Sequence, residues 1–146
     1  MKRAIAPAAL SAALLLPGVA SGQGTATPQA ALVHHPVTTS NAAAQRFFDE
    51  GLTLVYAFNR EEARKRFVLA AQADPKLAMA YWGIAMSYGP NINLPPDSAS
   101  DHAGYAAIQR ALALSGTANA SERDYIAAAA TRFSAAAKPN FDTLGR

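Results

Sequence analysis

Apolar residues recur with helical spacing through the middle of the chain. Between residues 44 and 58 they return every three or four positions, the spacing that gathers them on one face of an α-helix. That face contains Ala44, Phe47, Phe48, Gly51, Leu52, Leu54, Val55 and Phe58. A second helix is predicted over residues 60–73, with Ala63, Phe67 and Ala70 as its inner stripe. Two such helices in succession predict an antiparallel hairpin.

Polar residues and one glycine support this hairpin. Ser40 or Asn41 can cap the first helix, and Asn59 can cap the second, with Glu62 placed for a capping box. Gly51 lies in mid-helix, where glycine costs about 1 kcal/mol relative to alanine. We therefore expect a neighbouring helix to come too close to Gly51 for a side chain.

The pattern returns after 34 residues. A third helix is predicted over 77–88, and Phe47 and Tyr81 are separated by 81 − 47 = 34 positions. The same offset relates Phe48 to Trp82, Gly51 to Ala85, Leu52 to Met86 and Leu54 to Tyr88. A period of about 34 residues is typical of stacked helical hairpins.

The second predicted hairpin contains an insertion. Residues 89–97, GPNINLPPD, include three prolines and a glycine, which excludes a helix there. Asp97 or Ser98 is predicted to cap a fourth helix over 99–115. The insertion lengthens this hairpin by about seven residues relative to the period.

These residues carry a family resemblance. Phe47-x2-Glu50-Gly51-x2-Leu54, followed by Ala63-x3-Phe67-x2-Ala70 and Pro75, resembles the tetratricopeptide repeat, although Glu50 and Leu54 stand where leucine and tyrosine are common. The segments YAFN and DPKLAMAYWGIAMSYGPNIN, with His-His upstream, are similar to a group of uncharacterised exported bacterial tetratricopeptide proteins. Arg60 stands where members of that group often carry a histidine. The resemblance implies an all-α solenoid of helical hairpins.

The repeats divide most of the chain. Within residues 41–137 the predicted units are repeat 44–77, repeat 78–118 with the 89–97 insertion, and a partial repeat 119–137. Ser121 with Asp124 is predicted to open a fifth helix over 122–137, which has no hairpin partner. Residues 138–146 form a tail. Because a solenoid end normally has a capping element, we expect the chain to be a fragment of a longer protein.

The N-terminus has the pattern of an export signal. Lys2 and Arg3 precede an apolar run of 13 residues, and small residues follow a proline-glycine pair. The run is shorter than the roughly 20 residues that span a bilayer. We predict a cleaved signal peptide over 1–22, a flexible linker over 23–40, and a periplasmic or secreted protein without a membrane span.

Composition excludes several functions. The chain has 13 Lys+Arg and 10 Asp+Glu, and without the two basic residues of the signal the balance is 11 − 10 = +1, which gives no reason to expect nucleic acid. Cysteine is absent, which excludes disulfides, thiolate metal sites and cysteine nucleophiles. No P-loop, HExxH or G-x-S-x-G motif occurs, and Asp97, Asp101 and His102 are attributed to a helix start. The sequence predicts neither an enzyme nor a cofactor.

A second stripe beside the packing stripe carries the functional hypothesis. Large apolar residues fall in register through the 34-residue offset: Phe48, Leu52 and Val55 in one repeat, and Met79, Trp82 and Met86 in the next. In one interpretation the N-terminal linker or another helix buries them, as is usual for such stripes. In the other they line a concave groove that binds a protein or peptide partner, with Trp82 and Met86 as anchors.

The alternative function is small-molecule or metal binding. It would use the adjacent residues His34 and His35 together with Asn91 and Asn93 in the 89–97 loop. Neighbouring side chains of an extended segment point to opposite faces, and two ligands do not complete a metal site. The asparagines are as well suited to holding their own loop through backbone hydrogen bonds.

Overall fold

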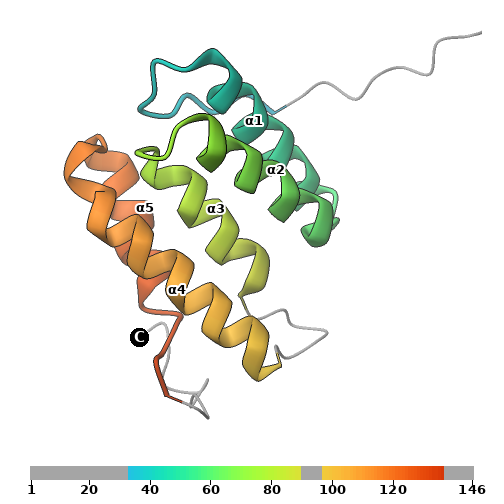
Figure 1. The fold of residues 1–146 in the computed structure, drawn as a ribbon, viewed down its shortest axis with the longest axis vertical. Helices are drawn as coiled ribbons and strands as arrows, with labels where there is room; N and C mark the ends of the chain where they lie inside the picture. Colours follow the sequence, from blue (N-terminus) through green and yellow to red (C-terminus); the bar gives the residue numbers. More distant parts are fainter. Residues whose placement is uncertain (1–32, 90–96, 137–146) are drawn as a thin grey trace, which may run out of the picture. The chain divides into compact units, whose positions relative to one another are not determined.

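A computed structural model describes residues 33–89 and 97–136, and every element in these residues is helical (Figure 1). The elements are α1 (Ala42–Tyr56), α2 (Arg60–Ala73), α3 (Ala78–Tyr88), α4 (Ser98–Leu114), the short 3-10 helix η1 (Ser115–Thr117) and α5 (Ala120–Ala130). The predicted all-α class is confirmed. The predicted signal peptide (1–22), the first part of the predicted linker, most of the predicted 89–97 insertion and the predicted tail (138–146) lie outside the described residues.

The helices form two layers. Each helix packs on the next one in the chain, and α3 also contacts both α1 and α5. One layer therefore contains α1, α3 and α5, and the other contains α2 and α4 (Figure 1). The central helix α3, AMAYWGIAMSY, has no charged residue, as suits a helix with neighbours on several sides. None of the helices in the described part of the chain is both long and apolar enough to span a membrane.

The second helices of the two hairpins bury equivalent positions. Ala63, Phe67 and Ala70 of α2 are buried, which confirms the predicted inner stripe. Gly104, Ile108 and Ala111 of α4 are buried in the same order, with the constant offset 104 − 63 = 108 − 67 = 111 − 70 = 41. That offset equals the 34-residue period plus the seven residues of the predicted insertion.

One aromatic ring joins three helices. Phe67 of α2 is fully buried, and a Cβ atom added to Gly51 of α1 would lie 2.8 Å from its Cε1 atom. A Cβ atom added to Gly83 of α3 would lie 2.4 Å from its Cδ1 atom. The close neighbour expected at Gly51 is therefore the Phe67 ring. The matching role of Gly83 was not predicted.

Most helix starts follow the sequence. Asn41 accepts hydrogen bonds from the backbone N–H groups of Ala43 and Ala44, and Asn59 and Asp97 are the N-caps of α2 and α4. The predicted capping box of α2 is incomplete, because the Glu62 carboxylate accepts a hydrogen bond from Lys65 at 2.7 Å.

The fifth helix differs from its prediction at both ends. Its N-cap is Asn119, which forms a capping box with Glu122, and Ser121 and Asp124 have no capping role. It ends at Ala130, before the predicted end at 137. Beyond the helix, Phe133 lies where a Cβ atom on Gly104 would be 2.6 Å from its ring. The sequence shows no helix breaker near Ala130, so this packing against α4 could not be predicted.

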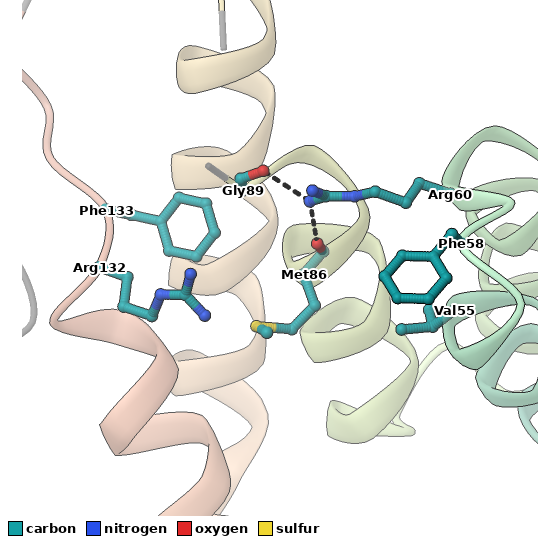
Figure 2. Close-up of a pocket in the computed structure, with 7 residues that line it drawn as sticks. All are labelled: Val55, Phe58, Arg60, Met86, Gly89, Arg132 and Phe133. Atoms are coloured by element: carbon teal, nitrogen blue, oxygen red, sulfur yellow. Dashed lines mark hydrogen bonds between the residues drawn. The ribbon is translucent and has the colours of Figure 1, made fainter. Parts of the chain in front are cut away.

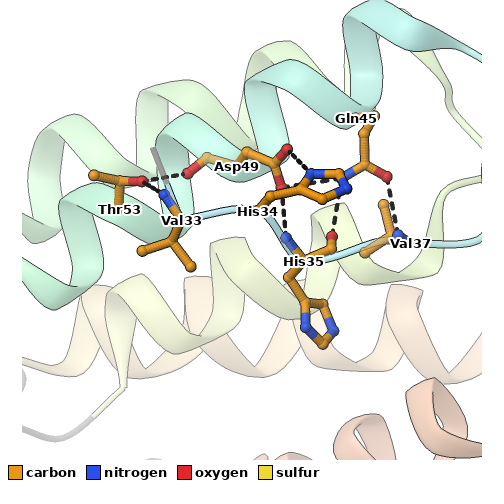
Figure 3. Close-up of polar contacts among 7 residues, drawn as sticks. All are labelled: Val33, His34, His35, Val37, Gln45, Asp49 and Thr53. Atoms are coloured by element: carbon orange, nitrogen blue, oxygen red, sulfur yellow. Dashed lines mark hydrogen bonds and ion pairs between the residues drawn. The ribbon is translucent and has the colours of Figure 1, made fainter. Parts of the chain in front are cut away.

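Residues 33–40 belong to the predicted flexible linker (23–40), but in the structure they form an extended strap along α1 (Figure 3). Alternate backbone N–H groups donate to side chains on successive turns of that helix: Val33 to Thr53, His35 to Asp49 and Val37 to Gln45, at 2.9, 3.0 and 2.9 Å. The next N–H, of Thr38, donates to Glu122 of α5 at 2.6 Å. The strap therefore connects the first and last helices of the layer formed by α1, α3 and α5.

Candidate functional site

The six predicted groove residues do not share one environment. Phe48 and Leu52 of α1 and Met79 of α3 are buried, whereas Val55, Trp82 and Met86 are half-buried. They lie on neighbouring helices, as the 34-residue offset requires. Half of the predicted groove is therefore core, and the other half reaches the surface.

The strap and α5 cover the buried half. The ring of His35 in the strap lies 6.2 Å from that of Phe48 and 6.1 Å from that of Tyr125 on α5. Tyr125 in turn lies 6.2 Å from Trp82. Both coverings named in the sequence analysis, the N-terminal segment and another helix, are thus present at this stripe.

A small cavity remains between these covers. It has a volume of about 90 Å³ and is lined by His35, Phe48, Leu52, Tyr56, Met79, Trp82 and Tyr125. Tyr56 and Tyr125 are 67% and 49% exposed. Four of its lining residues, Phe48, Leu52, Met79 and Trp82, were predicted groove residues.

Sequence reasoning missed the two tyrosines. Tyr56 lies one position beyond Val55, at the last residue of α1. Because Tyr56 is exposed at the end of the helix, it does not belong to the periodic apolar pattern from which the groove was predicted. Tyr125 belongs to a helix whose bounds were predicted incorrectly, so its position beside Trp82 had no sequence signal.

The other two predicted groove residues, Val55 and Met86, line a second cavity of about 260 Å³. Its remaining lining residues are Phe58, Arg60, Gly89, Arg132 and Phe133 (Figure 2). Arg60 donates hydrogen bonds from its Nη2 atom to the backbone carbonyls of Met86 and Gly89, at 2.6 and 2.5 Å. The C-terminal end of α3 thus fixes one guanidinium group in this cavity.

The two histidines have separate roles in the strap. His34 Nδ1 lies 2.7 Å from Asp49 Oδ2, while the ring of His35 points away toward the aromatic cavity (Figure 3). Asp49 also accepts hydrogen bonds from the His35 backbone N–H and from Gln45. Within residues 33–89 and 97–136, no group of three or more His, Cys, Asp or Glu side chains could hold a metal ion. Asn91 and Asn93 lie outside the described residues.

The acids at the start of α4 serve that helix. The Asp97 carboxylate accepts a hydrogen bond from the backbone N–H of Ser100 at 2.8 Å, and this bond holds its pKa below the ordinary value. Burial raises the pKa of Asp101, and the nearby charge of Asp97 adds to that rise. Asp97 is thus the helix cap that the sequence predicted as one of two choices.

No protein-family model matches this chain, and no curated protein or solved structure matches it either.

Proposed function

We propose that this chain is an exported, tetratricopeptide-type helical solenoid that binds a segment of another protein. The equal burial of equivalent positions in α2 and α4 supports a repeat architecture. The pattern of the first 22 residues supports export, which would place the partner in the periplasm or outside the cell.

The observation that carries the proposal is the aromatic rim of the 90 Å³ cavity. Tyr56 and Tyr125 are exposed and Trp82 is half-buried beside them. Tyrosine and tryptophan are enriched among the few residues that dominate protein–protein binding energy. About half or more of each tyrosine side chain remains exposed around an apolar floor, and that exposed surface is available to a partner.

The size of the cavity limits what can enter it. It is smaller than the roughly 150 Å³ cavity that holds a benzene molecule, so it admits one aliphatic side chain. The strap already lies along part of this face, hydrogen-bonded to α1 through His35 and to α5 through Thr38. The partner we propose is therefore a protein segment that inserts one aliphatic anchor between Tyr56 and Tyr125.

Random peptides displayed on phage, selected on the purified chain, test this function. We expect the selected peptides to share an aliphatic residue and to lose about thirtyfold in affinity for Tyr125→Ala, the loss of about 2 kcal/mol that defines a hot spot. Val68→Ala is the matched control, because Val68 is an exposed apolar residue on α2, in the other layer. Enrichment of no peptide, or equal affinities for wild type and Tyr125→Ala, would refute the proposed function.

A further inference from the structure

The cavity at the end of α3 combines positive charge with apolar walls. Figure 2 shows Arg132 and Phe133 on one side, Phe58 and Arg60 on the other, and Met86 between them. Arg60 is the first residue of α2, and Arg132 follows the end of α5. Two cationic side chains from separate elements therefore face a single cavity.

Arg60 is held in a fixed position. Both of its observed hydrogen bonds run from Nη2 to carbonyl groups at the C-terminal end of α3, those of Met86 and of the capping residue Gly89. These carbonyls lie at the negative end of the helix dipole, where a cation is favourable. A guanidinium has five N–H donors, so two bonds leave donors for a ligand.

The two positive charges of this cavity are not neutralised by an acidic residue among its described lining residues. Burial lowers the pKa of Arg60, and the positive charge of Arg132 lowers it further. Among the residues that the structure describes, no acidic side chain lines the cavity. A bound anion would offset the repulsion between the two guanidinium groups, and Arg is well suited to bind a carboxylate with two parallel hydrogen bonds.

Phe58 adds an apolar wall at a cost to the fold. It is 90% exposed and has a backbone φ of 59°, in the left-handed region that non-glycine residues rarely adopt. Backbone strain at such positions is concentrated at binding sites. An exposed aromatic ring in a strained turn gives the chain no packing energy, but it gives a ligand a flat surface.

We propose that this cavity binds a small organic anion with an apolar body, a site separate from the proposed peptide anchor. The carboxylate lies between Arg60 and Arg132, and the apolar body packs against Phe58, Met86 and Phe133. The volume of about 260 Å³ is just below the roughly 300 Å³ at which ordinary ligand pockets begin, which fits a carboxylate with a single ring or a short chain.

Calorimetric titration of the full-length chain with 3-phenylpropanoate and with its neutral amide tests the proposal. The two probes share shape and apolar surface, and the amide replaces one carboxylate oxygen by NH2, which removes the negative charge and one hydrogen-bond acceptor. We expect the acid to bind at least about tenfold more tightly than the amide, the ratio that a charge-assisted hydrogen bond supports. Equal affinities, or no binding of the acid, would overturn the proposal without involving any variant.

Variants then locate the site. Arg132→Gln should bring the acid and amide to within about twofold of each other, whereas Arg132→Lys should keep part of the preference for the acid. Arg110→Gln, which removes one positive charge from the exposed side of α4, should leave the preference unchanged. Phe58→Ala should weaken the acid and the amide alike, and Tyr125→Ala should affect neither. A preference that survives Arg132→Gln would place the anion elsewhere and refute this site.

Discussion

Replacing Gly83 by alanine tests the packing of three helices with one carbon atom. The new Cβ atom would lie 2.4 Å from Cδ1 and 2.6 Å from Cε1 of Phe67. The same edge of the ring also lies against Gly51, where an added Cβ atom would be 2.8 Å from Cε1. Since Phe67 is fully buried, the ring has no open space to move into.

The expected change in the free energy of unfolding follows from two opposing effects. Adding a methyl group to a packed core costs about 1–3 kcal/mol. The upper part of that range applies, because 2.4 Å is far inside the separation of about 3.5 Å at which two carbons attract. Alanine recovers about 1 kcal/mol of helix propensity relative to glycine. We therefore expect Gly83→Ala to destabilise the chain by about 2 kcal/mol.

Urea unfolding followed by far-UV circular dichroism measures this change. Gly116→Ala is the control, because an added Cβ atom there meets nothing within 4 Å, and we expect it to be neutral or slightly stabilising. Shortening the ring should relieve the clash, so Gly83→Ala with Phe67→Leu should be less destabilised than the sum of the two single changes, by about 1 kcal/mol. If Gly83→Ala matched or exceeded the wild type in stability, the Phe67 packing described here would be incorrect.

Two further predictions concern the strap and the start of α4. Asp49→Ala should destabilise the chain by about 2 kcal/mol and speed amide exchange at His35, because it removes a buried carboxylate that accepts from two part-buried donors. His34→Ala should cost less than about 1 kcal/mol, since the His34 side chain is 65% exposed; equal losses in the two variants would contradict this assignment. An NMR titration should place the pKa of Asp97 below 3.8. Because folding lowers this pKa, the stability that the cap contributes should be fully present above the unfolded-state pKa and disappear as the pH falls through the folded-state pKa. A midpoint at or above 3.8 would mean that the bond to Ser100 is absent in solution.

The helices could be predicted because their signals are local. The apolar period and Asn59 placed the second helix at residues 60–73, the bounds that α2 has. The end of α5 could not be predicted, because no helix breaker stands near Ala130 and Phe133 packs against Gly104 of another helix. In the sequence, the only sign of such a contact is the glycine itself, which indicates close packing but not which residue packs against it.

The functional surface was harder to predict than the fold. Periodicity placed Phe48 and Met79 on the correct face, but their burial depends on a segment that has no periodicity. The sequence marked Arg60 as the first residue of a charged helix and as the replacement of a histidine common in similar proteins. Its role at the end of α3 requires the packing of two helices and could not be predicted from either feature. A contact between a charged side chain and a neighbouring helix produces no regular spacing of residues, so the sequence pattern does not reveal it.

The strap did leave a signal, which is visible once the structure is known. Its acceptors Gln45, Asp49 and Thr53 lie four residues apart on α1, and its donors are alternate residues of an extended chain. Four residues of an α-helix rise about 6.0 Å, and two residues of an extended strand advance about 6.6 Å. These two spacings agree closely enough for three successive hydrogen bonds. A slip of the strap by one residue would turn each of the three donor N–H groups away from the helix. The polar stripe of Gln45, Asp49 and Thr53 on α1 therefore selects the extended, fixed path of residues 33–37 and closes this side of the helical layer.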